Sequence, residues 1–265
     1  MLEIKNLTCG YDSKFILKDI NFRIDTGNIV GIIGPNGSGK TTLLRAITRV
    51  VKPKNGIVVF EGKDISQMGF KELARKLAVV SQNFETGSIT VEEFVLLGRI
   101  PYYEKFQFLE TKMDIEVAER CMDLTDTLRL KDRFMEEISG GERQLALIAR
   151  ALAQQPKLIL LDEPTTHLDI THQVKILDLI KRLNTELGLT VIMVLHDLNL
   201  ASEYCHRLVL IHNGRIHKIG LPQEVLDYKI IEEVYKTLVV VKENPISKKP
   251  FVILVSEANK KEFAE

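Results

Sequence analysis

The fold of this chain is decided by one glycine-rich segment, Gly34-Pro35-Asn36-Gly37-Ser38-Gly39-Lys40-Thr41. An apolar run, Ile29–Ile33, comes directly before it and predicts a strand that is buried on both faces. A helical stretch follows, from Lys40 to about Val50. The segment fits the pattern G-x-x-x-x-G-K-[ST], and its place between a buried strand and a helix is the setting in which that pattern binds phosphate.

The residue types in this segment suit the phosphates of a nucleotide. Glycine lets the main chain curl so that successive N–H groups point at an anion, and the positive end of the following helix dipole faces the same place. Lys40 can reach the β- and γ-phosphates, and the hydroxyl of Thr41 can bind Mg²⁺. We therefore expect a phosphate site formed by Gly34, Pro35, Asn36, Gly37, Ser38, Gly39, Lys40, Thr41 and Thr42.

Two acidic residues, Asp162 and Glu163, follow the apolar run Leu158–Leu161. In an open α/β sheet, ligands bind beyond the carboxyl ends of the strands, which is also where a phosphate loop lies. Asp162 would hold Mg²⁺, and Glu163 would polarise a water molecule in line with the γ-phosphate. Alone, a strand that ends in Asp-Glu-Pro is more often an ordinary turn, so this prediction depends on the loop upstream.

The second half of the chain predicts a largely parallel core. Two apolar runs, Leu158–Leu161 and Thr190–Leu195, are typical of buried strands. Between them, apolar residues recur at helical spacing, and Gly188 offers a C-terminal stop for the helix. A strand, a helix and a strand joined by short connections indicate a right-handed crossover in a parallel sheet.

Two other regions have different patterns. Ile20–Ile24 alternates apolar and polar residues, which indicates a half-buried antiparallel strand. From about 84 to 155 helical periodicity dominates, with a capping box at Thr90. Further helices are expected at Lys112–Leu124 and Glu142–Gln155, and a type I′ hairpin at Asn213-Gly214. The predicted fold class is an α/β P-loop NTPase. It has a largely parallel core, an N-terminal antiparallel β subdomain and an inserted helical subdomain (about 84–155), all within one domain, 1–265.

Composition limits the classes of protein to which this chain can belong. The 265 residues are 45% hydrophobic, and 36 basic and 36 acidic side chains cancel, which gives no global reason to expect nucleic acid as a partner. Cys9, Cys121 and Cys205 are far apart and lack the spacing of metal ligands, so we expect free thiols in a reducing compartment. No apolar run approaches the ~18 residues needed to cross a bilayer. We expect a cytoplasmic protein that reaches the membrane through a partner.

One further segment separates the classes of phosphate-loop protein, Ile138-Ser139-Gly140-Gly141-Glu142-Arg143-Gln144. It opens a helix with Ser139 as the expected N-cap, which makes a second helix N-terminus able to face an anion. Alone, it would be an ordinary capped helix start. Together with the phosphate loop, it resembles the signature sequence of the ABC transporter ATPase family, and the resemblance covers nearly the whole chain.

Other residues match that family in order. Tyr11 is similar to the aromatic residue that stacks on adenine. Gln82, in Val80-Ser81-Gln82-Asn83, is similar to the Q-loop glutamine that touches Mg²⁺ or the attacking water. Thr165–Asp169 resembles the D-loop, in which Asp169 communicates across a dimer, and His196 resembles the switch histidine that holds the γ-phosphate. Alone, Tyr11 would be an edge-strand aromatic and His196 a hydrogen-bonded residue at a strand end.

The chain departs from the commonest family pattern at three positions. Ile138 stands for leucine, Glu142 for glutamine and His167 for a small residue. All three are tolerable substitutions, but His167 could also alter communication across the dimer.

The resemblance implies an ATPase that works as a head-to-tail dimer, with ATP and Mg²⁺ held between two copies of the chain. One copy would supply the phosphate loop with Tyr11, the Mg²⁺ ligands Thr41, Gln82 and Asp162, and the catalytic residues Glu163, His196 and Gln82. The other copy would supply Ser139, Gly140, Gly141, Glu142 and Asp169. The implied partners are integral membrane permease subunits and, indirectly, a periplasmic or lipoprotein substrate-binding protein. These partners would place the chain at the cytoplasmic face of the cell membrane.

The cargo is suggested by Leu96–Tyr103, which resembles the corresponding stretch in ATPases of iron–siderophore, haem and cobalamin importers. The resemblance makes Arg99, Tyr102 and Tyr103 candidates for contact with the permease. From the residues alone, this stretch would be an exposed helix end with a proline stop.

Two alternatives to this function remain. A molybdate, tungstate or other importer ATPase is open. An ABC ATPase acting on nucleic acid or ribosomes is disfavoured, since those usually carry two cassettes or a long coiled coil. A small-molecule kinase with a phosphate loop would leave Ser139–Gln144 unexplained.

Overall fold

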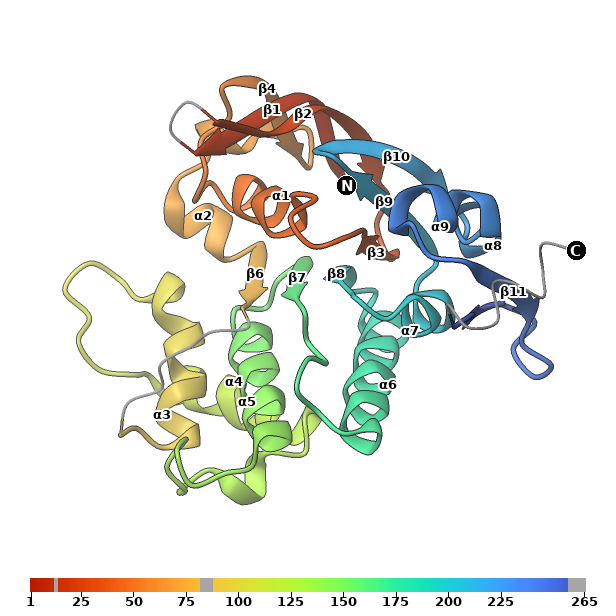
Figure 1. Ribbon diagram of the computed structural model, residues 1–265. Coiled ribbons are helices and arrows are strands. Elements are labelled where there is room, and N and C mark those ends of the chain that lie inside the picture. Colours follow the sequence, from red (N-terminus) through yellow and green to blue (C-terminus); the bar gives the residue numbers. More distant parts are fainter. Residues whose placement is uncertain (12–13, 82–87, 257–265) are drawn as a thin grey trace, which may run out of the picture. The chain divides into compact units, whose positions relative to one another are not determined.

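A computed structural model describes residues 1–11, 14–81 and 88–256 of the chain (Figure 1). The chain forms two compact units, one made of Met1–Ser66 with Ile192–Glu265 and the other of Gln67–Val191. The second unit is therefore one continuous segment of sequence, placed between the two segments of the first.

An antiparallel sheet with the strand order β2-β1-β4-β5 lies in the first unit. Its strands are β1 (Leu2–Tyr11), β2 (Lys14–Ile24), β4 (Asn55–Phe60) and β5 (Lys63–Asp64). β1 pairs with β2 on one side and with β4 on the other. The alternating pattern of Ile20–Ile24 is confirmed as the end of β2, where Phe22 lies opposite Ile4.

The first unit also contains parallel strands, and these position the phosphate loop. β3 (Ile29–Ile33) runs parallel to β9 (Arg207–His212), which pairs in turn with the antiparallel β10 (Arg215–Gly220). On the other side of β3 lies the end of β8 (Thr190–Val194), since the next residue, Leu195, donates from its main-chain N to Ile32 O at 3.1 Å. Every residue of β3 and β8 is buried, as the continuous apolar runs predicted.

The turn between β9 and β10 is formed by Asn213 and Gly214, whose φ angles of 50° and 72° are both positive. This is the requirement of a type I′ hairpin, and the predicted hairpin is confirmed. A Cβ at Gly214 would lie 1.9 Å from the main-chain oxygen of Ile16, so the close approach of β2 also requires glycine.

The helices of the first unit are α1 (Lys40–Ile47), α7 (Leu198–Tyr204), α8 (Pro222–Val225) and α9 (Tyr228–Tyr235); a short 3₁₀ turn, η1 (Ile65–Gln67), leads out of it. The predicted α1 extended to Val50, and this bound is wrong. Arg49 has a φ of 64°, in the left-handed region that an α-helix cannot continue through.

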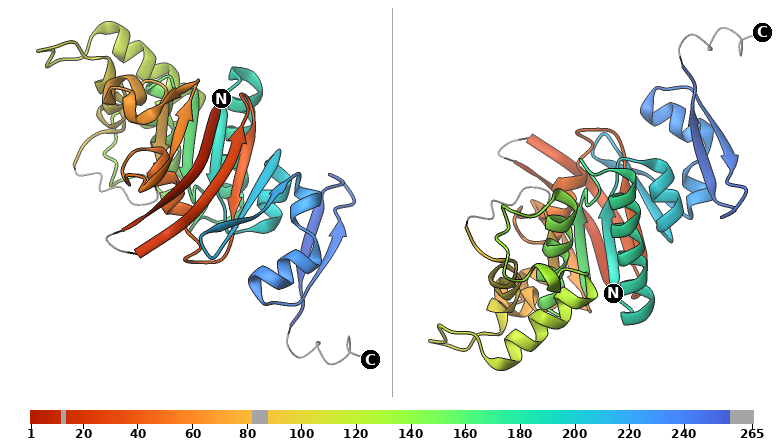
Figure 2. Two further views of the ribbon diagram at one scale, coloured as in Figure 1. Left: turned by 90° about the horizontal axis from the view of Figure 1, so that it is seen from above. Right: turned by 90° about the horizontal axis from the view of Figure 1, so that it is seen from below.

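The C-terminal part of the first unit is a hairpin of β11 (Val239–Glu243) and β12 (Pro250–Leu254), drawn in dark blue beside α9 in Figure 2. β12 is also tied to α7. Asn199 exchanges two hydrogen bonds with the main chain of Val252, and Ser202 Oγ donates to Pro250 O at 2.7 Å.

The second unit combines a pair of parallel strands, β6 (Leu77–Val80) and β7 (Leu158–Asp162), with helices. These are α2 (Phe70–Ala74), α3 (Val91–Leu96), η2 (Leu97–Tyr102), α4 (Lys112–Leu124), η3 (Leu128–Leu130), α5 (Gly140–Ala153) and α6 (Ile170–Leu187). α3 and α4 pack against α5. The bounds of α4 and the capping box at Thr90 are confirmed. Treating 84–155 as an inserted subdomain stays a prediction.

Among the described residues, no helix is both long and apolar enough to span a bilayer. Cys9, Cys121 and Cys205 are free and buried, and burial raises the pKa of each thiol, to about 11 for Cys9 and Cys121 and about 12 for Cys205. The cysteines therefore behave as small apolar side chains.

Candidate functional site

The segment Gly34–Gly39 joins β3 to α1 in the first unit, as predicted. The φ angle is 147° at Gly34 and 108° at Gly39, which are conformations that glycine adopts readily. A Cβ at Gly34 would lie 2.1 Å from the main-chain oxygen of Ile211, and one at Gly39 would lie 2.5 Å from the Leu17 side chain. Both the curl of the loop and its close packing therefore require these glycines.

Lys40 begins α1 and turns its side chain back over the loop. Its Nζ donates to the main-chain oxygens of Gly34 at 2.9 Å and Pro35 at 3.0 Å, and the residue is only 6% exposed. Within the described part of the chain, Ser38 Oγ is buried and has no hydrogen-bond partner. A held ammonium group and an unpaired hydroxyl at a helix N-terminus fit a phosphate chain. Thr41, half-buried, comes next on the helix.

Tyr11 ends β1 in the same unit. Its hydroxyl accepts a hydrogen bond from Arg45 Nη1 at 2.9 Å, and the residue is 40% exposed. Arg45 belongs to α1, so the tyrosine is tied to the helix that begins at the phosphate loop. An accessible ring held there suits stacking on a base, and this role stays a prediction.

His196 lies just beyond β8 and is exposed. The bond from Leu195 N to Ile32 O places it at the end of a strand that neighbours β3, the strand from which the phosphate loop starts. On its other side, Asp197 caps α7 by accepting hydrogen bonds from the main chain of Asn199 and Leu200. The main chain around His196 is thus held on both sides.

Asp162 and Glu163 lie at the end of β7 in the second unit, and both are half-buried. Glu163 has a φ of 54°, which is uncommon outside glycine and costs conformational energy. Its Oε2 accepts a hydrogen bond from Thr166 Oγ1 at 3.1 Å. An unusual main-chain conformation and the Thr166 hydroxyl therefore both help to set the direction of the Glu163 carboxylate.

The predicted D-loop, Thr165–Asp169, connects β7 to α6. His167 lies in it with a φ of 63°. Gln173, on the first turns of α6, donates from Nε2 to the main-chain oxygens of Thr165 at 3.3 Å and Leu168 at 3.0 Å. Asp169 is the N-cap of α6. The D-loop is therefore fastened to the helix that follows it.

The predicted signature segment opens α5, with Ser139 as its N-cap. Ser139 Oγ accepts from Glu142 N, and the Glu142 carboxylate accepts from Ser139 N and Oγ, which completes a capping box. Arg129 Nη2 donates to Glu142 at 2.7 Å. The bond from Arg129, with those from Ser139, lowers the pKa of Glu142 to about 2. The acid that departs from the family pattern therefore stays charged and stabilises the helix start.

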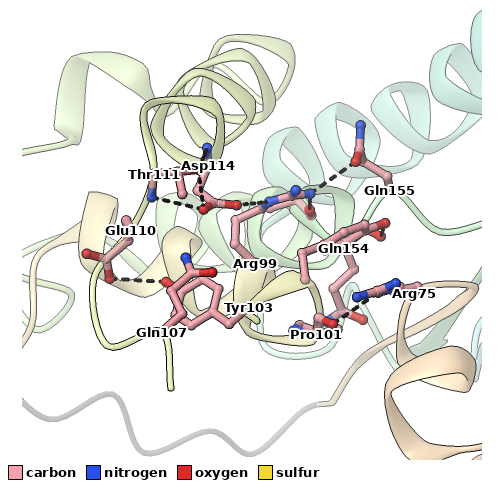
Figure 3. Close-up of polar contacts among 12 residues, drawn as sticks. Arg75, Arg99, Pro101, Tyr103, Gln107, Glu110, Thr111, Asp114, Gln154 and Gln155 are labelled. Atoms are coloured by element: carbon pink, nitrogen blue, oxygen red, sulfur yellow. Dashed lines mark hydrogen bonds and ion pairs between the residues drawn. The ribbon is translucent and has the colours of Figure 1, made fainter. Parts of the chain in front are cut away.

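The interpretation of Arg99 as a contact to the permease is wrong, because Arg99 is only 3% exposed. Its guanidinium donates to Asp114 Oδ1 at 2.9 Å, Ala153 O at 2.8 Å and Gln155 Oε1 at 3.1 Å (Figure 3). It also lies 3.9 Å from the centre of the Tyr102 ring. Arg99 thus joins η2 and α4 to the C-terminal end of α5, the helix that the signature segment begins.

The two tyrosines are held in the same region. The Tyr102 hydroxyl donates to Gln154 O at 2.9 Å, and the Tyr103 hydroxyl donates to Glu110 at 3.2 Å (Figure 3). Burial and the negative charge of Glu110 raise the pKa of Tyr103 to about 12. Both tyrosines are partly accessible, so their contact with a permease stays a prediction.

Sequence reasoning missed the residues that hold the predicted ones in place, namely Arg45, Arg129, His172 and Gln173. His172 and Gln173 could have been found from a local pattern. Asp169 comes directly before an apolar helical repeat, which marks it as an N-cap, and the partners of an N-cap are the next residues of the helix. For Arg45 and Arg129 no local pattern exists, since their partners are distant in sequence.

Gln82 falls outside the described residues, so its role stays a prediction. Within the described ranges, no group of three or more His, Cys, Asp and Glu residues could hold a metal ion. Thr41 in the first unit offers a hydroxyl oxygen, and Asp162 in the second offers a carboxylate oxygen. Each is a type of ligand that suits Mg²⁺.

The strand–loop–helix geometry defines a P-loop nucleotide-binding protein, with a second capped and glycine-rich helix start. Residues 17–166 match the ABC transporter family. The chain belongs to this family.

Three known proteins show how far the similarity extends. The chain is 41% identical, over 95% of its length and 92% of the relative, to a probable siderophore transport system ATP-binding protein of Bacillus subtilis (strain 168). It is similar, with a TM-score of 0.85 and 27% identity over 97% of this chain and 98% of the other, to a chain of an inward-facing transporter assigned to the metal-chelate type of ABC transporters. A dimeric ATP-binding cassette in a post-hydrolysis state with ADP and Pi matches with a TM-score of 0.72 and 32% identity, over 84% of this chain and 99% of the cassette.

Proposed function

We propose that this chain is the ATP-binding and ATP-hydrolysing subunit of an importer for iron chelates. The observation that carries the proposal is the presence of two helix N-termini built for an anion in one chain. One is the curled loop with Lys40, and the other is the Ser139 cap, which is exposed and has glycine on its first turn. The family membership and the siderophore relative support the same conclusion.

The phosphate loop binds ATP. The main-chain N–H groups of the loop, the ammonium of Lys40 and the hydroxyl of Ser38 surround the phosphates, with Thr42 on the following turn, while Tyr11 stacks on the base. A bound Mg²⁺, held by Thr41, Asp162 and Gln82, would neutralise charge on the β- and γ-phosphates.

Hydrolysis needs one polarised water molecule and a γ-phosphate that is held still. Glu163 accepts a hydrogen bond from the water, and the Thr166 hydroxyl keeps that carboxylate oriented. His196 donates to the γ-phosphate, and Gln82 contacts the water or the metal. These residues contribute mainly by positioning and by stabilising charge, as is general for phosphoryl transfer.

A second copy of the chain completes each site. Its Ser139, Gly140 and Gly141 present the N-terminus of α5 to the γ-phosphate, with Glu142 as part of the cap and Asp169 on the D-loop. The dimeric cassette with ADP and Pi supports this arrangement. A monomer then holds half of each site.

The transport partners follow from the same proposal. Permease subunits bind the chain at the cytoplasmic face of the membrane, and a substrate-binding protein delivers the cargo to them. The metal-chelate similarity favours an iron chelate over molybdate or tungstate. No observation on the chain favours an action on nucleic acid or ribosomes.

The proposed activity is tested by Mg-ATP hydrolysis over a range of protein concentrations. A shared site predicts a rate that rises faster than linearly with concentration, until the dimer saturates. Size-exclusion chromatography with ATP shows whether the protein is monomeric. If it stays monomeric and its hydrolysis rate is strictly proportional to protein concentration at all dilutions, the proposed shared site is contradicted. The cargo is tested in proteoliposomes with the permease: ferric-siderophore-loaded binding protein should stimulate ATP hydrolysis, whereas the haem- and cobalamin-loaded forms should not.

A further inference from the structure

Gly141, in the signature segment, and His172, at the start of α6, are in direct contact within the second unit. A Cβ at Gly141 would lie 2.1 Å from Cδ2 and 2.8 Å from Nε2 of His172, far inside contact distance. At the neighbouring Gly140 the nearest atom to such a Cβ is Leu168 Cδ2, at an ordinary 3.8 Å. The imidazole ring of His172 therefore fills the space beside Gly141. The space beside Gly140 is not filled in this way.

Asp169 fixes the same ring from its other side. His172 Nδ1 lies 2.9 Å and 3.0 Å from the two Asp169 carboxylate oxygens, and His172 N donates to Oδ1 at 2.8 Å. These main-chain and side-chain bonds hold the pKa of Asp169 below its ordinary value. Since an ionised carboxylate only accepts hydrogen bonds, Nδ1 carries the proton, which leaves the Cδ2–Nε2 edge towards Gly141.

We propose that His172 is a positioning residue that locks the D-loop to the signature segment of the same subunit. The inference rests on the proposed function, in which Asp169 and Gly141 both face the partner copy. The ring is bonded to Asp169 and packed against Gly141, and closely packed groups transmit displacement because they leave no gap to absorb it. The two segments therefore reach the partner in one fixed spacing.

The direct test is ATP-driven dimerisation, measured by sedimentation in a Glu163→Gln background that retains the bound nucleotide. His172→Phe keeps a ring without the donor, and His172→Asn keeps a donor without the ring. We expect His172→Phe and His172→Ala to weaken dimerisation about two- to fivefold, as for one lost hydrogen bond to a carboxylate that is largely exposed. His172→Asn, which can still bond Asp169, should lie between them and the parent. Dimerisation at parental affinity in all three variants would overturn the inference.

A second test uses the steric contact. Gly141→Ala should weaken dimerisation because its Cβ displaces the ring, and the double variant Gly141→Ala with His172→Ala should be weakened by less than the two single effects combined, because the space beside Gly141 is then free. A double variant in which the two single effects add in full would show that His172 and Gly141 act independently, and would contradict the inference.

Two controls separate a positioning role from a general loss of structure. ATP affinity of the monomer, measured at dilute protein, and the thermal midpoint should stay at parental values in the His172 variants; a large drop in either would overturn the positioning role. His217→Phe and His217→Asn are matched substitutions at a histidine that also faces a carboxylate, Glu233 at 3.7 Å, in the first unit. They should leave dimerisation unchanged. If the Glu163→Gln parent itself fails to dimerise with ATP, the proposed function fails; if the parent dimerises and His172 variants match it, only this inference fails.

Discussion

At the scale of single residues, Glu163 combines a strained main chain with a half-buried carboxylate that is oriented by Thr166. We expect Glu163→Gln to bind ATP normally and to hydrolyse it about 10²- to 10⁴-fold more slowly, because an amide cannot accept the proton of the attacking water. Single-turnover hydrolysis and nucleotide binding, measured on the same preparation, check this. Thr166→Val, which removes only the orienting hydroxyl, is the matched control and should lose far less. Turnover within about twofold of the wild type in Glu163→Gln would contradict the assignment.

Glu142 predicts a dependence of stability on pH. Its pKa is lowered from 4.5 to about 2, chiefly by Arg129. The contribution of Glu142 to the free energy of unfolding is therefore fully present above its ordinary pKa of 4.5, and it is lost as the pH falls through its pKa of about 2 in the folded protein. Since Arg129 is largely exposed, screening limits the contribution to about 1 kcal/mol. Glu142→Gln should therefore be less stable than wild type at pH 7, and the difference should shrink from pH 4.5 towards pH 2. Urea unfolding of both proteins at several pH values measures it, and a difference independent of pH would contradict it.

At the scale of elements, the Arg99 cluster ties three segments of the second unit together. Arg99→Ala would leave the Asp114 carboxylate buried without its cation, and we expect a loss of about 3–5 kcal/mol in the free energy of unfolding. Chemical denaturation measures this loss. The control is Arg75→Ala, which removes an exposed arginine that also lies over the Tyr102 ring, 4.8 Å from its centre, and should cost less than about 1 kcal/mol. Equal effects of the two substitutions would contradict the role of Arg99.

The elements that the sequence predicted well are those with a local physical cause. The buried runs of β3 and β8, the bounds of α4 and the caps at Thr90 and Ser139 depend on neighbours within a few residues. The error at Arg99 has the opposite origin. Its acceptors Ala153 and Gln155 lie far away in sequence, so an exposed helix end and a buried anchor have the same local pattern.

The same difference between local and long-range causes applies to the candidate site. The phosphate loop and the signature helix could be predicted because glycine spacing and capping are written into consecutive residues. The left-handed conformation of Glu163 and the contact between Gly141 and His172 could not be predicted, since each depends on how separate segments pack. The C-terminal β11–β12 hairpin, which leans on α7 and α9, was not predicted for the same reason.

At the scale of the whole molecule, the proposed function requires two copies to combine for activity, and inactive variants should therefore complement each other. Lys40→Ala damages the half-site that binds phosphate, and Ser139→Arg damages the half-site presented by the partner. Mixed in equal amounts, they form hybrid dimers with one intact site, so about a quarter of wild-type hydrolysis should return. Hydrolysis assays of each variant and of the mixture measure this. A mixture with no more activity than its components would contradict a shared site that works independently of its twin.

The discontinuous first unit has a consequence for synthesis on the ribosome. The apolar strand β3 emerges early, but its parallel neighbour β9 follows only after the whole of Gln67–Val191 has been made. At typical elongation rates, the interval between Ile33 and Arg207 lasts roughly 9 to 35 s. For most of that time neither β9 nor β8, the two neighbours of β3, has been made, so the nascent chain exposes an apolar strand while Gln67–Val191 is still being completed. Newly made β3 is thus a natural target for a chaperone, and slower translation should increase aggregation.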